Sequence, residues 1–200
     1  MNNNLNWQQH AIKPIDRERL MRHKSLVIWL TGLSASGKST ISNFVEKQLY
    51  QKGIHSYLLD GDDIRQGLNK DLGFSEHDRT ENIRRIAEVA HTIRQSGLVT
   101  IVSTISPYKS NRELARDIIS EQYFHEVYVS CALEVCEQRD PKGLYHKARS
   151  GQIPQFTGVD QPYEPPTNPK LTLPTDKLNI EQASLTLVHY IVSKVKEDRT

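Results

Sequence analysis

One stretch of nine residues constrains the fold of this chain more than any other. Residues 32–40 read GLSASGKST and fit the pattern G-x-x-x-x-G-K-[ST], with glycines at Gly32 and Gly37. A loop with this spacing curls so that its backbone N–H groups point at phosphate oxygens, and the following helix adds its positive N-terminal end. Lys38 is then placed to reach the outer phosphates and the Ser39 hydroxyl to ligate Mg²⁺. The stretch therefore predicts a nucleoside triphosphate site.

The residues on either side of this loop have the patterns that the motif requires. Residues 26–30 (LVIWL) form a short apolar run that is typical of a buried parallel strand. Residues 40–50 place apolar side chains at helical spacing. The alternative, a linker rich in Gly and Ser, would not lie between a strand and a helix.

The composition sets broad limits on the class of protein. Two hundred residues suit a single domain, and we expect an arm with a short helix over residues 1–24 and one domain over 25–200. A net charge of +2 is too small to indicate a nucleic-acid or membrane partner. No apolar run resembles a signal peptide or a membrane span, so we expect a cytoplasmic protein. Cys131 and Cys136 are expected to be buried or half-buried free thiols.

Predicted strands and helices alternate along the chain. Expected strands lie at 26–30, 55–59, 98–102, 126–131 and 171–173. Expected helices lie at 16–22, 40–50, 78–94, 111–120 and 134–139, and a last helix follows Asn179, with Gln182 at the capping-box position. This order predicts an α/β fold of the P-loop NTPase type, a doubly wound, mostly parallel sheet with helices on both faces.

A cluster of carboxylates follows the second expected strand. Residues 60–63 read Asp-Gly-Asp-Asp, and the C-terminal end of a strand is where open α/β sheets bind ligands. The alternative is that Asp62 or Asp63 caps a helix that begins near Ile64. We favour a functional role for Asp62.

Two arginines and an asparagine lie close to this cluster in sequence. Arg79 and Asn82 are three residues apart and share one face near a helix N-terminus, and Arg65 precedes them. An arginine there is often simply solvated. Since arginine binds phosphate and sulfate in bidentate fashion, however, the three residues indicate a pocket for an anionic acceptor.

Ser106 follows the third expected strand, within the polar segment 103–109. It is a candidate catalytic hydroxyl, but the pattern by itself favours a turn residue before Pro107.

Six of the nine prolines lie between residues 154 and 174, after a basic segment containing Lys142, Lys147 and Arg149. We interpret residues 140–170 as a lid that closes over nucleotide, with a solvated surface loop as the alternative. Phe156 within it is expected to be exposed and able to stack on a base.

Four segments of the chain resemble the adenylylsulfate kinases (APS kinases). They read GLSASGKST, DGDDIRQGLNKDLGFSEHDRTENIRRIAEVA, ISPY and CEQRDPKGLYHKARSGQIPQFTGVDQPYEPP. The resemblance extends from about residue 7 to the last helix, and the second and fourth segments are more specific than the loop. It implies Mg²⁺-dependent phosphoryl transfer from ATP to the ribose 3′-hydroxyl of adenylyl sulfate (APS) by a homodimer. The products are ADP and 3′-phosphoadenylyl sulfate (PAPS).

The resemblance also assigns roles to individual residues. The implied ATP site consists of Gly32, Leu33, Ser34, Ala35, Ser36, Gly37, Lys38, Ser39, Thr40 and Arg139. The implied acceptor site consists of Asp62, Arg65, Phe74, Arg79, Asn82, Ile105, Ser106, Lys147 and Phe156, in which Phe74 and Phe156 hold the adenine. The implied catalytic residues are Asp62, Lys38 and Ser106, and Ser39 and Asp62 are the implied metal-binding residues. Ser106 matches a serine described as a phosphoserine intermediate, but direct in-line transfer assisted by Asp62 is the simpler mechanism.

Two positions depart from the family pattern. Ala35 stands where the family usually has glycine, and we expect ATP binding to survive this change. Thr104 replaces the aromatic residue of the usual S-F-I-S-P-Y, which affects the expected acceptor affinity and not the reaction type.

Three other functions were weighed. The nearest is a P-loop kinase of another small acceptor, such as a nucleoside monophosphate or a sugar acid, although a sugar acid needs no aromatic surface such as Phe74. A guanine-dependent switch usually carries N-K-x-D late in the chain, whereas Asn69-Lys70-Asp71 comes early and with the wrong spacing. A nucleic-acid end kinase would need a basic face with interleaved aromatics, which the sequence does not offer.

Overall fold

A parallel β-sheet forms the centre of the molecule. The computed structural model describes residues 10–196. Within that range the sheet has five strands, all parallel, in the order β2-β3-β1-β4-β5. The strands are β1 (Val27–Thr31), β2 (Ser56–Asp60), β3 (Val99–Ser103), β4 (Phe124–Ser130) and β5 (Leu171–Pro174).

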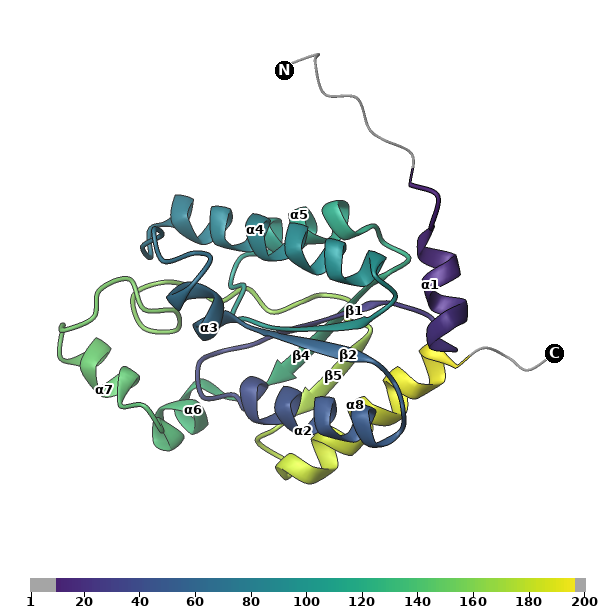
Figure 1. The fold of residues 1–200 in the computed structure, drawn as a ribbon. Coiled ribbons are helices and arrows are strands. Elements are labelled where there is room, and N and C mark those ends of the chain that lie inside the picture. The colour runs from purple at the N-terminus through teal and green to yellow at the C-terminus, as the bar shows by residue number, and fades with distance from the viewer. Residues whose placement is uncertain (1–9, 197–200) are drawn as a thin grey trace, which may run out of the picture.

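Helices cover both faces of this sheet (Figure 1). Helices α4 (Glu76–Gln95) and α5 (Lys109–Ile119) lie on one face, and α2 (Lys38–Gln51) and α8 (Ile180–Val195) lie on the other. The remaining helices are α1 (Pro14–Met21), α3 (Gly61–Gln66), α6 (Leu133–Arg139) and α7 (Leu144–Arg149). The predicted doubly wound α/β fold is confirmed.

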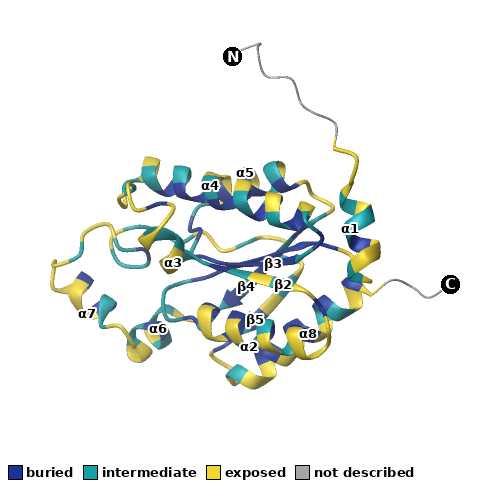
Figure 2. Ribbon diagram, viewed as in Figure 1, coloured by how far each residue is buried: buried dark blue, intermediate teal, exposed yellow. Residues whose placement is uncertain are grey.

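The alternation of side chains along β1 explains why both faces need cover. Every residue of β1 is buried, and neighbouring side chains point to opposite faces. Ile28 and Leu30 pack in the core beneath α2 and α8, whereas Val27 and Trp29 pack in the core beneath α4 and α5. Figure 2 shows the buried residues concentrated in the sheet and on the helix faces turned toward it.

The helix caps were predicted with mixed success. Asn179 and Gln182 form the predicted capping box at the start of α8. The alternative weighed for Asp62 and Asp63, that one of them caps a helix near Ile64, does not hold. Asp60 accepts a hydrogen bond from the Asp62 backbone N–H at 3.0 Å, so α3 begins at residue 61 and Asp62 lies in its first turn.

The segment predicted to be a lid, residues 140–170, contains more regular structure than the sequence suggested; it is called the lid below. Its proline content favoured a loop, but the basic segment before the prolines forms α7, whose Tyr145 and Ala148 are buried. The chain between α7 and β5 then has neither helix nor strand beyond a single bridge between Thr157 and Gln161. Over residues 10–196, none of the helices is long and apolar enough to cross a membrane.

Candidate active site

A cavity of about 920 Å³ opens where β1, β2 and β3 end. Its lining comes from the loop before α2, from α3 and α4, from the segment after β3, and from the lid. The sequence-predicted residues that line it are Ser34, Ala35, Gly37, Lys38, Ser39, Thr40, Asp62, Arg65, Phe74, Arg79, Asn82, Ile105, Ser106, Arg139 and Phe156. Four predicted residues, Gly32, Leu33, Ser36 and Lys147, are outside this lining.

The phosphate loop, residues 32–40, is shaped by its two glycines. A Cβ at Gly32 would lie 2.5 Å from the carbonyl oxygen of Val129, so only glycine fits against β4. Gly37 caps α2 with φ of 102°, a left-handed conformation that glycine adopts without strain. The first turn of α2 therefore presents its N–H groups and its positive end to the cavity.

Lys38 is held against the loop from within. Its side chain is buried, and Nζ donates to the carbonyl oxygens of Gly32 at 2.9 Å and Leu33 at 2.7 Å. Burial lowers the pKa of Lys38 from 10.5 to about 8, because desolvation disfavours the charged form. A phosphate group beside this ammonium would favour the charged form and raise the pKa again.

Ala35 occupies a position that suits glycine. Its φ is 59°, in the left-handed region, where a Cβ meets the backbone unfavourably. The phosphate loop thus retains its shape with alanine at some cost in stability.

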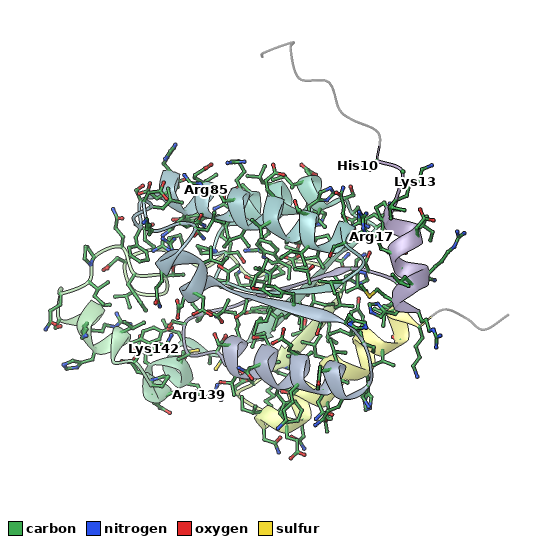
Figure 3. The ribbon with its side chains drawn as sticks, viewed as in Figure 1. His10, Lys13, Arg17, Arg85, Arg139 and Lys142 are labelled. Carbon is green, nitrogen blue, oxygen red and sulfur yellow. The ribbon has the colours of Figure 1, made fainter. Side chains whose placement is uncertain are left out.

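Asp62 lines the cavity and pairs with a lysine of the segment predicted to be a lid. The ion pair joins its carboxylate to the Lys142 ammonium, and both side chains are more than half exposed. This contact raises the pKa of Lys142. Arg139 and Lys142 lie together at the lid end of the molecule, away from Lys13 and Arg17 beside α1 (Figure 3).

The oxygen donors in the cavity fit a magnesium ion. Ser39, Asp60 and Asp62 all line it, and Mg²⁺ prefers oxygen ligands. In the described part of the chain no group of three or more His, Cys, Asp or Glu side chains gathers to hold a metal. Mg²⁺ in nucleotide sites uses one or two protein oxygens together with phosphate and water.

Arg79 and Asn82 are buried in α4, so the alternative of a solvated Arg79 is wrong. Arg79 Nε donates to the Phe74 carbonyl oxygen at 2.9 Å, and Nη2 donates to that of Gln155 in the lid at 2.6 Å. Asn82 Oδ1 accepts from Asn69 Nδ2 at 3.0 Å. These bonds fix both side chains at the cavity wall.

Phe74 is a partly exposed ring flanked by cations. The guanidinium carbon of Arg65 lies 4.6 Å from the ring centroid, and that of Arg79 lies 5.6 Å away. Arg65 Nη1 also donates to the Gly73 carbonyl oxygen at 2.9 Å. An aromatic surface and two positive charges therefore meet on one side of the cavity, which suits a ligand with a base and anionic groups.

Two predictions in the lid need correction. Phe156 is half-buried and not exposed, because its ring meets Tyr145 edge-on at 5.0 Å between centroids. Tyr145 in turn donates through its hydroxyl to the Ser34 carbonyl oxygen at 3.1 Å, which ties the lid to the phosphate loop. Lys147 is exposed on α7 and does not line the cavity, since the buried face of that short helix carries Tyr145 and Ala148.

Ser106 lines the cavity from the segment after β3. It is buried, its φ is 38°, and its Oγ accepts from Trp29 Nε1 at 3.1 Å. Thr104, the departure from the family pattern, is buried and lines the same cavity.

Arg139 joins two elements beneath the lid. Its Nη2 donates to the Thr175 carbonyl oxygen at 2.5 Å, and Nη1 contacts Cys131 Sγ at 3.5 Å. Cys131 and Cys136 are buried free thiols, as predicted.

Several lining residues were missed from the sequence. They include Asp60, Asp140, Pro141, Leu144, Ile153, Thr175, Leu178, Asn179 and Ile180. Thr175 directly follows β5, and the rule that ligands bind at strand ends would have indicated it.

The fold and the cavity define a class of protein. A parallel sheet with a phosphate loop after its central strand, beside a second subsite beneath a lid, is the architecture of a P-loop kinase acting on a small molecule. A model of the adenylylsulphate kinase family matches residues 24–174, and this chain belongs to that family.

Relatives cover nearly the whole chain. The adenylyl-sulfate kinase of Oceanobacillus iheyensis is 50% identical over 191 residues, 96% of each chain. That of Bacillus licheniformis is 50% identical over 196 residues, 98% of this chain and all of the relative. A solved structure of the Mycobacterium tuberculosis APS kinase in complex with AMPPNP and APS is 48% identical, with a TM-score of 0.78, and the match covers 82% of this chain and 96% of that one.

Proposed function

We propose that this protein transfers the γ-phosphoryl group of ATP to the ribose 3′-hydroxyl of adenylyl sulfate, giving ADP and 3′-phosphoadenylyl sulfate. One observation carries the proposal: a single cavity joins a phosphate loop to a second subsite with buried Arg79 and Asn82 and the ring of Phe74. The second subsite suits a nucleotide with anionic groups. The M. tuberculosis relative was solved with an ATP analogue and APS, which supports the same pair of substrates here.

The ATP end needs positioning and charge. The N–H groups of the phosphate loop and the start of α2 hold the phosphates, and Lys38 exchanges its bonds to two loop carbonyls for bonds to the outer phosphates. Ser39 and Asp62 would hold Mg²⁺, which neutralises charge on the transferred group. Arg139 lines the cavity beside Thr175, where it would contact the nucleotide.

Asp62 would orient the acceptor hydroxyl and accept its proton. Its carboxylate lines the cavity, and among the described residues it pairs with the exposed Lys142, so substrate can displace that lysine at small cost. Lys142 is then free to turn toward phosphate.

We propose direct transfer without a phosphoserine. Ser106 is 1% exposed, and its Oγ already accepts a hydrogen bond from the indole of Trp29. A buried hydroxyl held in this way suits a structural role in the acceptor pocket better than attack on ATP. Phosphoryl transfer depends mainly on positioning and electrostatics, which Asp62, Lys38 and Mg²⁺ supply.

The assembly and location remain predictions. We expect a homodimer in the cytoplasm, where the lid opens and closes over both substrates.

The test is ADP release from ATP and Mg²⁺ with adenylyl sulfate, AMP or gluconate as acceptor. We expect adenylyl sulfate, and neither AMP nor gluconate, to stimulate ADP release strongly. Stimulation by AMP instead would favour a nucleoside monophosphate kinase, and no stimulation by any acceptor would overturn the proposal and implicate Thr104 first.

A further inference from the structure

Arg112, in the first turn of α5, lies outside the cavity lining but bonds to three separate parts of the molecule. The side chain is 2% exposed. Its Nε donates to Glu126 Oε1 on β4 at 2.7 Å, Nη1 to the Ser106 carbonyl oxygen at 2.8 Å, and Nη2 to the Glu164 carbonyl oxygen at 2.7 Å. One buried guanidinium thus joins the sheet, the acceptor loop (residues 103–108) and the end of the lid.

The acceptor loop needs such support. Ser106 has a φ of 38°, which residues other than glycine rarely adopt and which neighbouring contacts must maintain. Trp29 holds the Ser106 hydroxyl, and Thr31 Oγ1 donates to the Ile105 carbonyl oxygen at 2.7 Å. Arg112 supplies the charged hydrogen bond to the Ser106 backbone.

The end of the lid is tied to the same loop. The Glu164 N–H donates to the Pro107 carbonyl oxygen at 2.9 Å, and Glu164 Oε2 accepts from the Lys109 N–H at 2.6 Å. The Tyr163 hydroxyl lies 3.0 Å from Thr31 Oγ1. Through Arg112, the acceptor loop and residues 163–164 form one connected unit.

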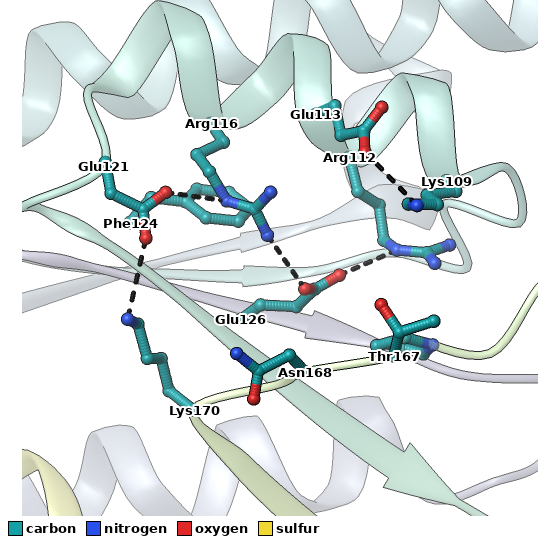
Figure 4. Close-up of a pocket in the computed structure, with 11 residues that line it drawn as sticks. Lys109, Arg112, Glu113, Arg116, Glu121, Phe124, Glu126, Thr167, Asn168 and Lys170 are labelled. Atoms are coloured by element: carbon teal, nitrogen blue, oxygen red, sulfur yellow. Dashed lines mark hydrogen bonds and ion pairs between the residues drawn. The ribbon is translucent and has the colours of Figure 1, made fainter.

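A second cavity, of about 270 Å³, marks the outer end of this network (Figure 4). Its charges are already paired: Arg116 bonds to Glu126 at 3.1 Å and to Glu121 at 3.0 Å, and Lys170 lies 3.5 Å from Glu121. Because these charges already bond to one another, we interpret this second cavity as structural support and not as a ligand site. Glu126, nearly as buried as Arg112, is the anion that fixes the arginine in place.

We propose that Arg112 is a positioning residue for the acceptor: it holds the carbonyl of Ser106, and with it Ile105 and Ser106, in the conformation that receives adenylyl sulfate. This inference rests on the proposed function. The role is specific to the acceptor end, because no Arg112 contact reaches the phosphate loop within the described residues.

The test compares KM values for the two substrates in three variants. Arg112→Lys retains a charge for Glu126 but cannot reach three acceptors. The double variant Arg112→Met with Glu126→Leu removes both buried charges together, so that folding is not lost to an unpaired ion. Arg116→Lys is the matched control, since Arg116 bonds to the same Glu126 but not to the loop. We expect KM for adenylyl sulfate to rise about tenfold in the first two variants, which is the effect of losing a charged hydrogen bond. KM for ATP in these variants, and both KM values in Arg116→Lys, should stay within about twofold of those of the unmodified protein.

Fluorescence of Trp29 gives a readout that needs no activity. In a Trp7→Phe background the only tryptophan is Trp29, whose indole bonds to Ser106. We expect both Arg112 variants to shift its emission and Arg116→Lys to leave it unchanged.

Each failure has a separate signature. An unchanged KM for adenylyl sulfate in both Arg112 variants, an equal rise in Arg116→Lys, or unshifted emission would overturn the positioning role. Absence of adenylyl sulfate-stimulated ADP release in the unmodified protein would instead overturn the proposed function, and the emission would still test the loop contact.

Discussion

The two ends of the cavity are built in different ways. The phosphate end comes from nine consecutive residues, and its shape follows from a close approach at Gly32 and a helix that starts at Lys38. The acceptor end collects Arg65 and Arg79, the segment around Ser106 and the lid residue Phe156, which lie far apart in sequence. The first end depends mainly on consecutive residues, with a long-range approach of Gly32 to β4, whereas the second depends throughout on long-range contacts such as those of Arg79 and Arg112. Substitutions should therefore separate into effects on ATP and effects on the acceptor.

The largest effect is expected at the phosphate end. Lys38→Met removes the charge nearest the transferred group, and we expect kcat to fall by about 10²–10³-fold or more. The free energy of unfolding at pH 7 should not fall in parallel, because a desolvated charge is removed as well as two hydrogen bonds. A kcat within tenfold of the unmodified enzyme would contradict the role of Lys38.

The second largest effect is expected at Asp62, which is proposed to act at both ends of the cavity. Asp62→Asn should lower kcat by about 10²-fold while the Kd for ATP changes little, since the amide cannot accept the proton of the hydroxyl. Asp63→Asn is the matched control, because Asp63 is exposed and is not part of the cavity lining. Equal losses in both variants would point to a disturbed α3 and not to chemistry at Asp62.

The acceptor end alone is tested at Arg79. Arg79→Lys loses the two-sided contact to Phe74 and Gln155, and we expect KM for adenylyl sulfate to rise about tenfold with KM for ATP unchanged. Arg84→Lys, on the exposed face of the same helix, should leave both values as they are. A comparable rise in KM for ATP would show that the two ends are not separable.

The buried Lys38 predicts a pH dependence of ATP binding. With its pKa at about 8 in the free protein and raised by phosphate in the complex, binding takes up a proton above pH 8. Affinity measured by calorimetry should fall by up to tenfold per pH unit there. Lys38→Arg, charged throughout this range, should flatten the profile.

Lys38 also makes the free energy of unfolding depend on pH. Between pH 8 and 10.5 the unfolded chain holds a proton on Lys38 that the folded chain has lost, so this group makes the free energy of unfolding rise with pH.

The smallest effect concerns strain in the phosphate loop. Ala35→Gly relieves a left-handed alanine and should raise the free energy of unfolding by about 0.5–1 kcal/mol. Gly53→Ala is the mirror control, since Gly53 has a φ of 70° with open space around its Cβ position, and it should lower stability by a similar amount. Chemical denaturation gives the free energy of unfolding of both variants. A lower free energy of unfolding in Ala35→Gly would show that the alanine is not strained.

The sequence predicted the fold and the strand-loop-helix setting of the phosphate loop because their signals are local. The apolar run before Gly32, the capping box at Asn179 and the carboxylates after β2 each follow from neighbouring residues. Asp60, and not Asp62 or Asp63 as the alternative had it, caps α3, because a strand that ends at residue 60 places that carboxylate just before the helix.

The acceptor end was predicted partly from the residues and partly through family resemblance. Arg65, Arg79 and Asn82 indicated an anion pocket by their place near the carboxylates, whereas the adenine-binding role of Phe74 and Phe156 came from the resemblance. The resemblance named Lys147, but the burial of Tyr145 and Ala148 turns that lysine outward on α7. No local pattern marks Arg112, whose three acceptors come from β4, the acceptor loop and the lid. Contacts of this kind depend on tertiary structure, which spacing does not encode.

The most direct test of the two-ended cavity is to compare adenylyl sulfate with its 3′-deoxy analogue as the acceptor. With adenylyl sulfate, we predict one ADP for each 3′-phosphorylated product detected by mass spectrometry. With the analogue, we predict competitive binding at the acceptor end and no stimulated ADP release. ADP release that is equal with both compounds, or that appears without a phosphorylated acceptor, would contradict the account.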